Sequence, residues 1–258
     1  MYPFKHLHIY YTINCGMYVY SGHTGILTDG ISTGGKAGMS DMPPQVISSM
    51  RSGTGFFSHL NAVLFTHAHE DHYDRKLLGD FLSSPYGKNV KCYCPRPTPS
   101  RDHRVRNTLS PRLIGEGVYY AEVGDFRILF IDTLHQGKQY RSVYHQSILL
   151  ESRGETVLFL GDGVLKENAA KNLRAFVPSV DQVFINALGL SDPGFRTFFR
   201  IVPVRALQVY HVAPEEKDIY NYYAVAKSAA RRLDLPNLSY NRLQPMSWLT
   251  EPAGWTKN

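Results

Sequence analysis

Short apolar runs divided by turn residues fill the first 65 positions of the chain and predict β-strands. Residues 6–20 are rich in Tyr, Ile and Val, and a polar break at Asn14, Cys15 and Gly16 divides them into two strands. Residues 26–30 predict a further strand end. Residues 62–65 are apolar at every position, which is the pattern of a strand buried on both faces of its sheet.

From residue 74 onward, the pattern alternates between helices and strands. The dipeptides Gly124-Asp125 and Arg153-Gly154 mark two hairpin turns. The strongest helix signal has a proline at its start, acidic residues in its first turn and arginines in its last turn. The predicted strands are residues 90–93, 118–123, 126–131, 147–150, 156–160, 182–185 and 206–210, and the predicted helices are residues 43–50, 74–82, 166–176 and 214–233.

The order of these elements favours one domain over residues 1–258, because no repeat, low-complexity tract or linker divides the chain. A strand-rich first part followed by alternating strands and helices is typical of sheets whose outer faces are covered by helices. Hydrophobic residues make up 43% of the chain and charged residues 19%, which predicts a sizeable core rather than disorder.

Composition also limits the location and the partners. No apolar run approaches the ~20 residues that a membrane-spanning helix needs, and the N-terminal residues show no secretory signal, so we expect a soluble cytoplasmic protein. The net charge of +6 favours a small anionic substrate. No dense Lys/Arg run indicates nucleic-acid binding. The oligomeric state, a homo-oligomer included, is left open.

The three cysteines are an odd number and do not have the spacing of a disulfide framework. Cys92 and Cys94 would share one face of a strand, and we interpret them as buried small apolar residues. A zinc thiolate site is the weaker alternative, because the chain has no second pair of cysteines.

A cluster of histidines and acids directly follows the apolar run at residues 62–65. Residues 66–72 hold three imidazoles and two carboxylates in the pattern His-x-His-x-Asp-His. Imidazole nitrogen and carboxylate oxygen are ligands that Zn²⁺ and similar cations prefer. A solvated histidine-rich loop is the weaker alternative, because the cluster adjoins a buried strand. The cluster therefore predicts a metal site.

Three further candidate ligands, His135, Asp162 and His211, each come shortly after a later predicted strand. Alone, the Gly-Asp-Gly sequence around Asp162 would be an ordinary turn. His135 or His211 alone would be a surface residue or a hydrogen-bonded core residue. Their repeated placement after strands instead indicates one site at one end of a sheet scaffold, where loops commonly carry functional groups.

These residues, in this order, resemble the metallo-β-lactamase-fold superfamily, in particular its small single-domain intracellular metal-dependent hydrolases. The resemblance implies an α+β fold, a four-layer αββα sandwich of two mixed β-sheets with helices on both outer faces. It also implies a site for two metal ions at one edge of the sandwich. By this resemblance, the first ion would be held by His67, His69 and His135, the second by Asp71, His72 and His211, with Asp162 bridging the two and Asp29 supporting the ligands from behind.

The resemblance further implies hydrolysis by a water shared between two divalent ions, which we expect to be Zn²⁺, with Mn²⁺ or Fe²⁺ as alternatives. Asp71 would orient this water and accept its proton. The expected target is an ester-type bond in a small phosphodiester or (phospho)lactone. A thioester hydrolase is an alternative, as is a non-catalytic metal-binding protein or a redox diiron protein. A β-lactamase is disfavoured, because Asp162 stands where those enzymes usually lack an Asp.

His145, at the start of a predicted strand, has two interpretations. It would either act as a catalytic residue that donates a proton to the leaving group, or cap a loop. The loop before it, residues 136–144, contains Lys138 and Arg141 and is expected to lie over the metal pocket. Glu70 occupies a spacer position of the histidine motif and is expected to face solvent.

Overall fold

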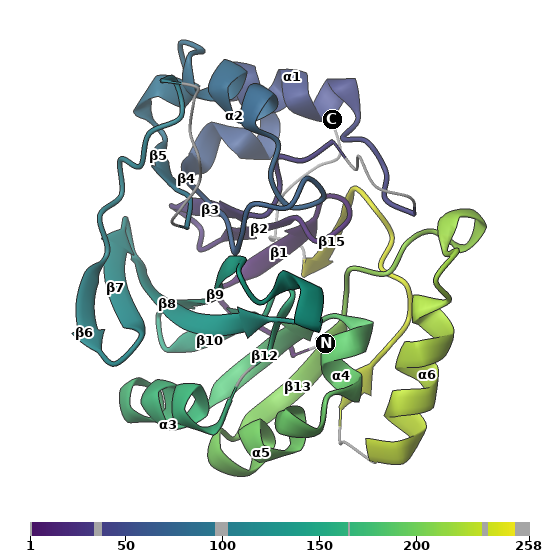
Figure 1. Ribbon diagram of the computed structural model, residues 1–258. Helices are drawn as coiled ribbons and strands as arrows, with labels where there is room; N and C mark the ends of the chain where they lie inside the picture. The colour runs from purple at the N-terminus through teal and green to yellow at the C-terminus, as the bar shows by residue number, and fades with distance from the viewer. Residues whose placement is uncertain (1, 34–37, 96–102, 165, 234–236, 251–258) are drawn as a thin grey trace.

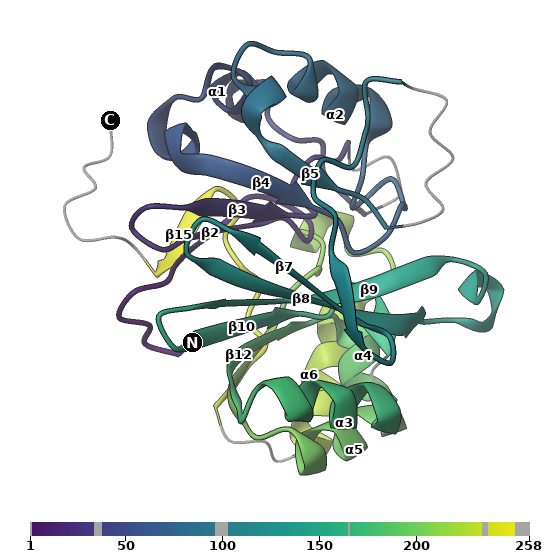
Figure 2. The same cartoon turned by 90° about the vertical axis from the view of Figure 1, so that its left-hand side faces the viewer.

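Two β-sheets lie face to face, and helices cover the outer side of each sheet (Figure 1). This computed structural model of the chain describes residues 2–33, 38–95, 103–164, 166–233 and 237–250. Seen from the side, the layers follow the order helix, sheet, sheet, helix (Figure 2). The predicted sandwich of two mixed sheets is therefore confirmed.

The first sheet brings together strands from near both ends of the chain. Its six strands, in spatial order, are β15 (Ser247–Thr250), β1 (His8–Tyr11), β2 (Met17–Tyr20), β3 (Gly25–Thr28), β4 (Leu60–Leu64) and β5 (Lys91–Tyr93). β1, β2 and β3 pair antiparallel, whereas β3, β4 and β5 pair in parallel. The parallel strands place the end of β4 beside the end of β3.

The second sheet is larger and has the same mixed character. Its strands are, in spatial order, β14 (Leu238–Ser239), β13 (Val204–Val209), β12 (Val180–Ile185), β10 (Glu155–Phe159), β9 (Tyr144–Ser152), β8 (Phe126–His135), β7 (Val118–Val123) and β6 (Arg112–Gly115), with β11 (Gly163–Val164) paired to β8. β10, β12 and β13 are parallel to one another. The predicted hairpins β7–β8 and β9–β10 are both formed.

Helices fill the two outer layers (Figure 1). The α-helices are α1 (Pro44–Ser52) and α2 (Arg75–Leu82) over the first sheet, and α3 (Glu167–Phe176), α4 (Ala187–Ser191), α5 (Pro193–Ile201) and α6 (Tyr222–Leu233) over the second. Short 3₁₀ turns are η1 (Gly55–His59), η2 (Gly87–Asn89), η3 (Lys138–Tyr140) and η4 (Glu215–Lys217). In the described part of the chain, no helix has the length and apolar character to cross a membrane.

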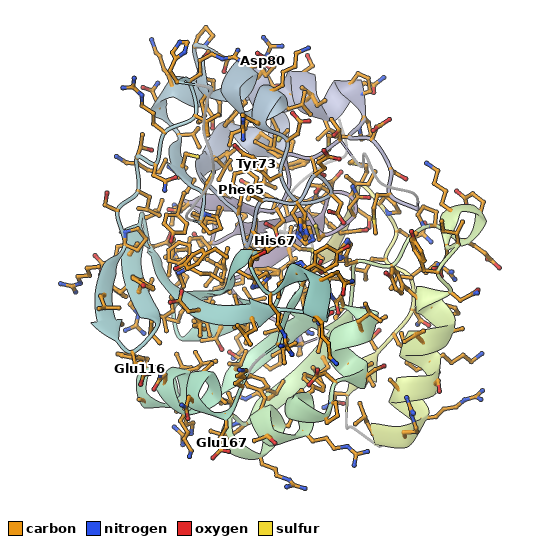
Figure 3. All side chains as sticks on the ribbon, viewed as in Figure 1. Phe65, His67, Tyr73, Asp80, Glu116 and Glu167 are labelled. Carbon is orange, nitrogen blue, oxygen red and sulfur yellow. The ribbon has the colours of Figure 1, made fainter. Side chains whose placement is uncertain are left out.

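Alternation along the strands divides the interior into three cores. Phe126 and Phe130 of β8 are buried between the two sheets, whereas Leu129 and Ile131 point to the core beneath α3 and α5. A third core lies between the first sheet and helices α1 and α2, and includes Phe65 just above the histidine cluster (Figure 3). The sheets are thus fixed from both sides, which gives their edges a defined position.

The helix predicted over residues 214–233 is wrong in its first part. The chain forms only the short turn η4 there, and α6 begins at Tyr222. The carboxylate of Asp218 accepts hydrogen bonds from the backbone N–H groups of Tyr222 and Tyr223, as a helix cap does. Asn221 has a φ of 52°, outside the range of a right-handed helix, so the helix begins only after this residue.

Other differences concern elements with weak sequence signals. Strands β6, β11, β14 and β15 and helices α4 and α5 are not among the predicted elements, and all of these except α5 have at most five residues. Residues 95–112, rich in Pro, Ser and Arg, are expected from the sequence to form an exposed excursion; residues 96–102 of it lie outside the described residues, and strand β6 begins at its last residue. Cys92 and Cys94 are buried, with their sulfur atoms 3.9 Å apart, as the strand interpretation predicted.

Candidate metal centre

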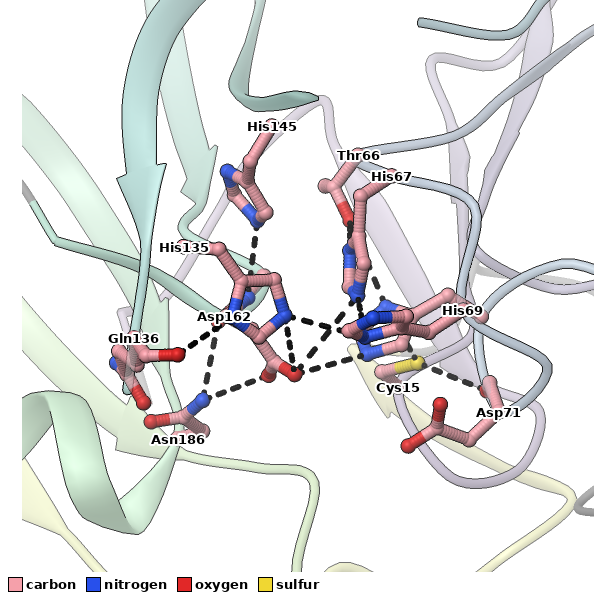
Figure 4. A network of polar contacts seen from close by, with 12 residues as sticks. Cys15, Thr66, His67, His69, Asp71, His135, Gln136, His145, Asp162 and Asn186 are labelled. Atoms are coloured by element: carbon pink, nitrogen blue, oxygen red, sulfur yellow. Dashed lines mark hydrogen bonds and ion pairs between the residues drawn. The ribbon is translucent and has the colours of Figure 1, made fainter. Parts of the chain in front are cut away.

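The predicted ligands meet at one edge of the sandwich, between the two sheets (Figure 4). The first sheet contributes the loop after β4, and the second contributes the ends of β8, β10 and β13. β8 and β10 run in the same direction, because each is antiparallel to β9, and β13 runs parallel to β10 through β12. Their C-terminal ends therefore share one edge, where residues that follow them come together.

A first group of ligand atoms surrounds the ring of His69. Its Nδ1 lies 3.0 Å from Nε2 of His67 and 3.1 Å from Nε2 of His135. Oδ2 of Asp162 lies 3.5 Å from Nε2 of His135 and 3.8 Å from Nε2 of His67. Tetrahedral zinc with bonds of about 2.0–2.1 Å to nitrogen separates neighbouring ligand atoms by about 3.4 Å. The spacing of this group fits one such ion.

A second group lies beside the first. Nε2 of His72 is 3.7 Å from Oδ2 of Asp162, and Nε2 of His211 is 3.4 Å from Oδ2 of Asp71. Both of these buried nitrogens lack a hydrogen-bond partner among the described residues. Buried polar atoms are normally satisfied, and these two face carboxylate oxygens across gaps that a cation would fill. The residues present therefore fit a second divalent ion.

Asp162 belongs to both groups. Its Oδ2 faces His67 and His135 of the first group and His72 of the second. Its Oδ1 accepts a hydrogen bond from the Nδ2 amide of Asn186 at 2.7 Å. Because one oxygen is held by Asn186, the other is directed between the two groups, which is the position of a bridging ligand.

A layer of supporting contacts fixes the orientation of the imidazoles. Asp29 accepts hydrogen bonds from the backbone N–H of Thr66 at 2.8 Å and from its hydroxyl at 2.7 Å, and lies 3.0 Å from Nδ1 of His72. The same hydroxyl is 3.0 Å from Nδ1 of His67. Nδ1 of His135 lies 2.7 Å from its neighbour's backbone carbonyl oxygen. Such contacts select the ring nitrogen that remains for a metal.

Cys15 also borders the centre, and the sequence offered no signal for this. Its buried sulfur lies 3.2 Å from Nδ1 of His72 and 3.4 Å from the backbone oxygen of Asp71. It sits in the turn between β1 and β2. A Cβ on the next residue, Gly16, would lie 2.8 Å from the Cα of Gly30, so the close approach of this turn to the site requires glycine. Asn186 and Thr66 were likewise missed as supporting residues.

The acidic and histidine side chains of the centre shift one another's pKa values. Burial opposes ionisation of Asp162, but His72 and His211 hold the pKa of its carboxyl well below the usual range. Burial likewise opposes protonation of His211, but Asp162 and Asp71 raise the pKa of its imidazole to about 9. The carboxylates thus attract positive charge to this edge of the sandwich. Divalent ions would provide that charge in place of protons.

His145 is buried behind the turn that carries Asp162. Its Nε2 accepts a hydrogen bond from the backbone N–H of Asp162 at 3.1 Å, and its Nδ1 lies 2.6 Å from the hydroxyl of Thr133. Burial lowers the pKa of its imidazole to about 3. A Cβ at Gly161 or at Gly163 would lie less than 3 Å from this ring, so glycine at both positions lets the turn pack against it. These contacts support the loop-positioning interpretation. The general-acid role stays a prediction.

A pocket of about 470 Å³ opens over the centre. Its floor is formed by His69, Asp71, His135, Asp162 and His211. Residues of the loop after β8 line one wall, as expected for a loop that begins beside a ligand. Glu70 is exposed, in accord with its spacer position.

Solved structures resemble this chain, although no protein-family model and no curated protein sequence matches it. A protein from Veillonella parvula, described as a possible metal-dependent hydrolase, has a TM-score of 0.64 at 14% identity and covers 95% of this chain and 99% of its own. The protein YhfI from Bacillus subtilis, described as a metallo-β-lactamase fold protein, has a TM-score of 0.59 at 14% identity and covers 96% of this chain and 100% of its own.

The chain has the metallo-β-lactamase fold. A variant of the β-hydroxylase CmlA has a TM-score of 0.64 at 14% identity, and the match covers 96% of this chain. It covers 55% of the CmlA chain, so the present chain spans about half the length of that protein. CmlA from Streptomyces venezuelae is described as a diiron β-hydroxylase. These likenesses establish the metallo-β-lactamase fold, whereas the candidate metal ligands are identified by the geometry of the side chains.

Asp162→Ala should reduce metal binding at both positions of this metallo-β-lactamase-fold protein, because the substitution removes the oxygen shared by the two groups. Elemental analysis of protein purified without chelator should find about two ions per wild-type chain and less than one in the variant. Glu70→Ala is the matched control and should retain the wild-type content, since this side chain is exposed. Equal losses in the two variants would show that the ligand assignment is wrong.

Two substitutions of His145 separate its proposed roles. The terminal oxygen of Gln can reach the position of Nε2, whereas Asn reaches only the position of Nδ1. If His145 positions Asp162, His145→Asn should weaken metal binding roughly 10- to 100-fold in calorimetric titrations, and His145→Gln should restore much of it. If His145 is instead a general acid, both variants should bind metal normally and lose turnover only on substrates with poor leaving groups.

Proposed function

We propose that this protein is a hydrolase that uses two divalent metal ions, with Zn²⁺ as the first candidate, to cleave an ester-type bond in a small molecule. A phosphodiester or a (phospho)lactone is the proposed bond, and a thioester is the alternative within the same chemistry. One observation supports the proposal most directly. Oδ2 of Asp162 lies 3.5 Å from Nε2 of His135 in one group and 3.7 Å from Nε2 of His72 in the other.

When bound, two divalent cations supply a water of lowered pKa as nucleophile and polarise the oxygen of the bond that breaks. The chain's own residues orient the reactants. Asp71 lines the pocket beside His211 and is the carboxylate proposed to accept the proton. The ring of Tyr140 packs against those of His69 and His135, with centroid distances of 5.1 and 5.0 Å, and so limits the access of bulk water.

A redox diiron protein is the second candidate, because the fold is shared with a protein described as a diiron β-hydroxylase. Histidine and carboxylate ligands also accept iron, so the ligand set is compatible with both functions. Oxygen chemistry would require bound iron, whereas hydrolysis would proceed with a metal that has no redox activity. Cytoplasmic location stays a prediction.

The full chain, reconstituted separately with Zn²⁺, Mn²⁺ and Fe²⁺, should hydrolyse at least one member of a panel of nitrophenyl phosphodiesters, lactones and thioesters. Chelation should abolish the activity, and Asp162→Ala should lower kcat/KM by roughly 10³-fold or more. Glu70→Ala should match the wild type. Metal-loaded protein without activity across the panel would contradict the hydrolase proposal. Oxygen-dependent absorbance changes in the iron-loaded protein would then favour the diiron candidate.

A further inference from the structure

The wall of the pocket differs in character from its floor. Seven large hydrophobic side chains are exposed in the described part of the chain, and three of them line this pocket. These are Tyr140 at 38% exposure, Leu188 at 46% and Tyr220 at 58%. Exposed apolar side chains that gather around a cavity mark a place where a ligand covers them. They line the same pocket as the side chains of the candidate metal centre.

These side chains come from separate parts of the chain. Tyr140 follows β8, Leu188 belongs to α4, and Tyr220 precedes α6. Tyr222 lies beside Tyr220, with ring centroids 5.5 Å apart, and Met39 completes the apolar part of the lining. Convergence of apolar groups from several segments on one cavity is the arrangement expected of a binding surface.

The polar side chains of the wall are uncharged. They are the amides of Gln136, Gln139 and Asn186. Lys138 and Arg141 lie on the same loop but are exposed and stand outside the lining of the described pocket. Phosphate and carboxylate groups are usually recognised by Arg, Lys or a helix N-terminus. The five-residue helix α4 begins in this lining, but the side chain of Asn186 already accepts a hydrogen bond from a backbone N–H of its first turn. An anionic group on the substrate, away from the bond that reacts, would here meet tyrosines and amides.

We propose that the substrate is a neutral ester or lactone with an aromatic or short alkyl group that packs against Tyr140, Leu188 and Tyr220. This inference rests on the proposed hydrolase function and narrows it away from the phosphodiester and from the anionic substrate expected from net charge. The reactive bond lies over the ligand side chains, and the apolar group lies along the wall. A water molecule adds across the acyl C–O bond, so an ester yields one carboxylic acid and one alcohol, and a lactone yields one hydroxy acid.

Contact between the apolar wall and the substrate should affect substrate binding more than the chemical step, because the wall touches the part of the substrate that does not react. The loss of one ring from such a pocket typically changes kcat/KM by roughly 10- to 100-fold. Tyr220 is a suitable residue to change, since it is 58% exposed and its loss leaves the core intact. Ile219 is a matched control, because it is adjacent, 61% exposed and outside the pocket lining.

The first measurement compares two ethyl esters of similar length on the zinc-loaded full chain, by proton release. Ethyl 3-phenylpropanoate carries a neutral ring, and monoethyl succinate carries a carboxylate. The aromatic ester should have a kcat/KM at least about tenfold higher. Tyr220→Ala should raise KM for the aromatic ester with little change in kcat, Tyr220→Phe should restore it, and Ile219→Ala should behave as the wild type.

The second measurement does not depend on turnover. The inert probe 3-phenylpropanamide should perturb tyrosine signals in NMR spectra of the wild type and of Ile219→Ala, but bind at least about tenfold more weakly to Tyr220→Ala. Preference for monoethyl succinate or for bis(4-nitrophenyl) phosphate, or equal behaviour of Tyr220→Ala and wild type, would overturn the inference. Binding of the amide that depends on Tyr220, without hydrolysis of any ester, would support the apolar pocket and contradict the proposed hydrolase instead.

Discussion

A single carboxylate, about 15% exposed, holds the two halves of the candidate centre together. Oδ2 of Asp162 faces histidines carried by both sheets, with His67 and His72 from the first and His135 from the second. Burying a carboxylate is costly unless opposite charge and hydrogen bonds compensate for the lost hydration. The surrounding imidazoles and the amide of Asn186 provide that compensation. The candidate ligands therefore come together only when the two sheets pack against each other.

The turn that carries this carboxylate is shaped for close approach. Gly161 has a φ of 57°, and a Cβ there would lie 2.8 Å from both Nε2 of His145 and the hydroxyl of Thr66. Thr66 belongs to the first sheet's loop and His145 to the second sheet, so the turn is held between them. The same hydroxyl is linked to the histidine cluster, directly to His67 and through Asp29 to His72. Small displacements of this turn would thus reach ligands of both groups.

The sequence predicted which candidate side chains would come together, because each lies at or after the end of an apolar strand, and strand ends are local features. It failed where a local break interrupts an otherwise helical pattern, and where distant segments decide the outcome. The helix over residues 214–233 was overextended because the Asp218 cap and the conformation of Asn221 interrupt it. Cys15 approaches the centre only through packing across the sheet. The apolar wall joins Tyr140 and Tyr220, which are brought together by tertiary structure alone.

The spread of the ligands along the chain also orders the steps of assembly. The histidine motif ends at residue 72, but the last candidate ligand, His211, follows β13, which pairs with β12. During synthesis, the early histidines emerge long before the strand that completes the site. If these residues bind metal as proposed, a nascent chain would hold an ion only loosely until β13 docks. Full loading would then be a late event, coupled to closure of the second sheet.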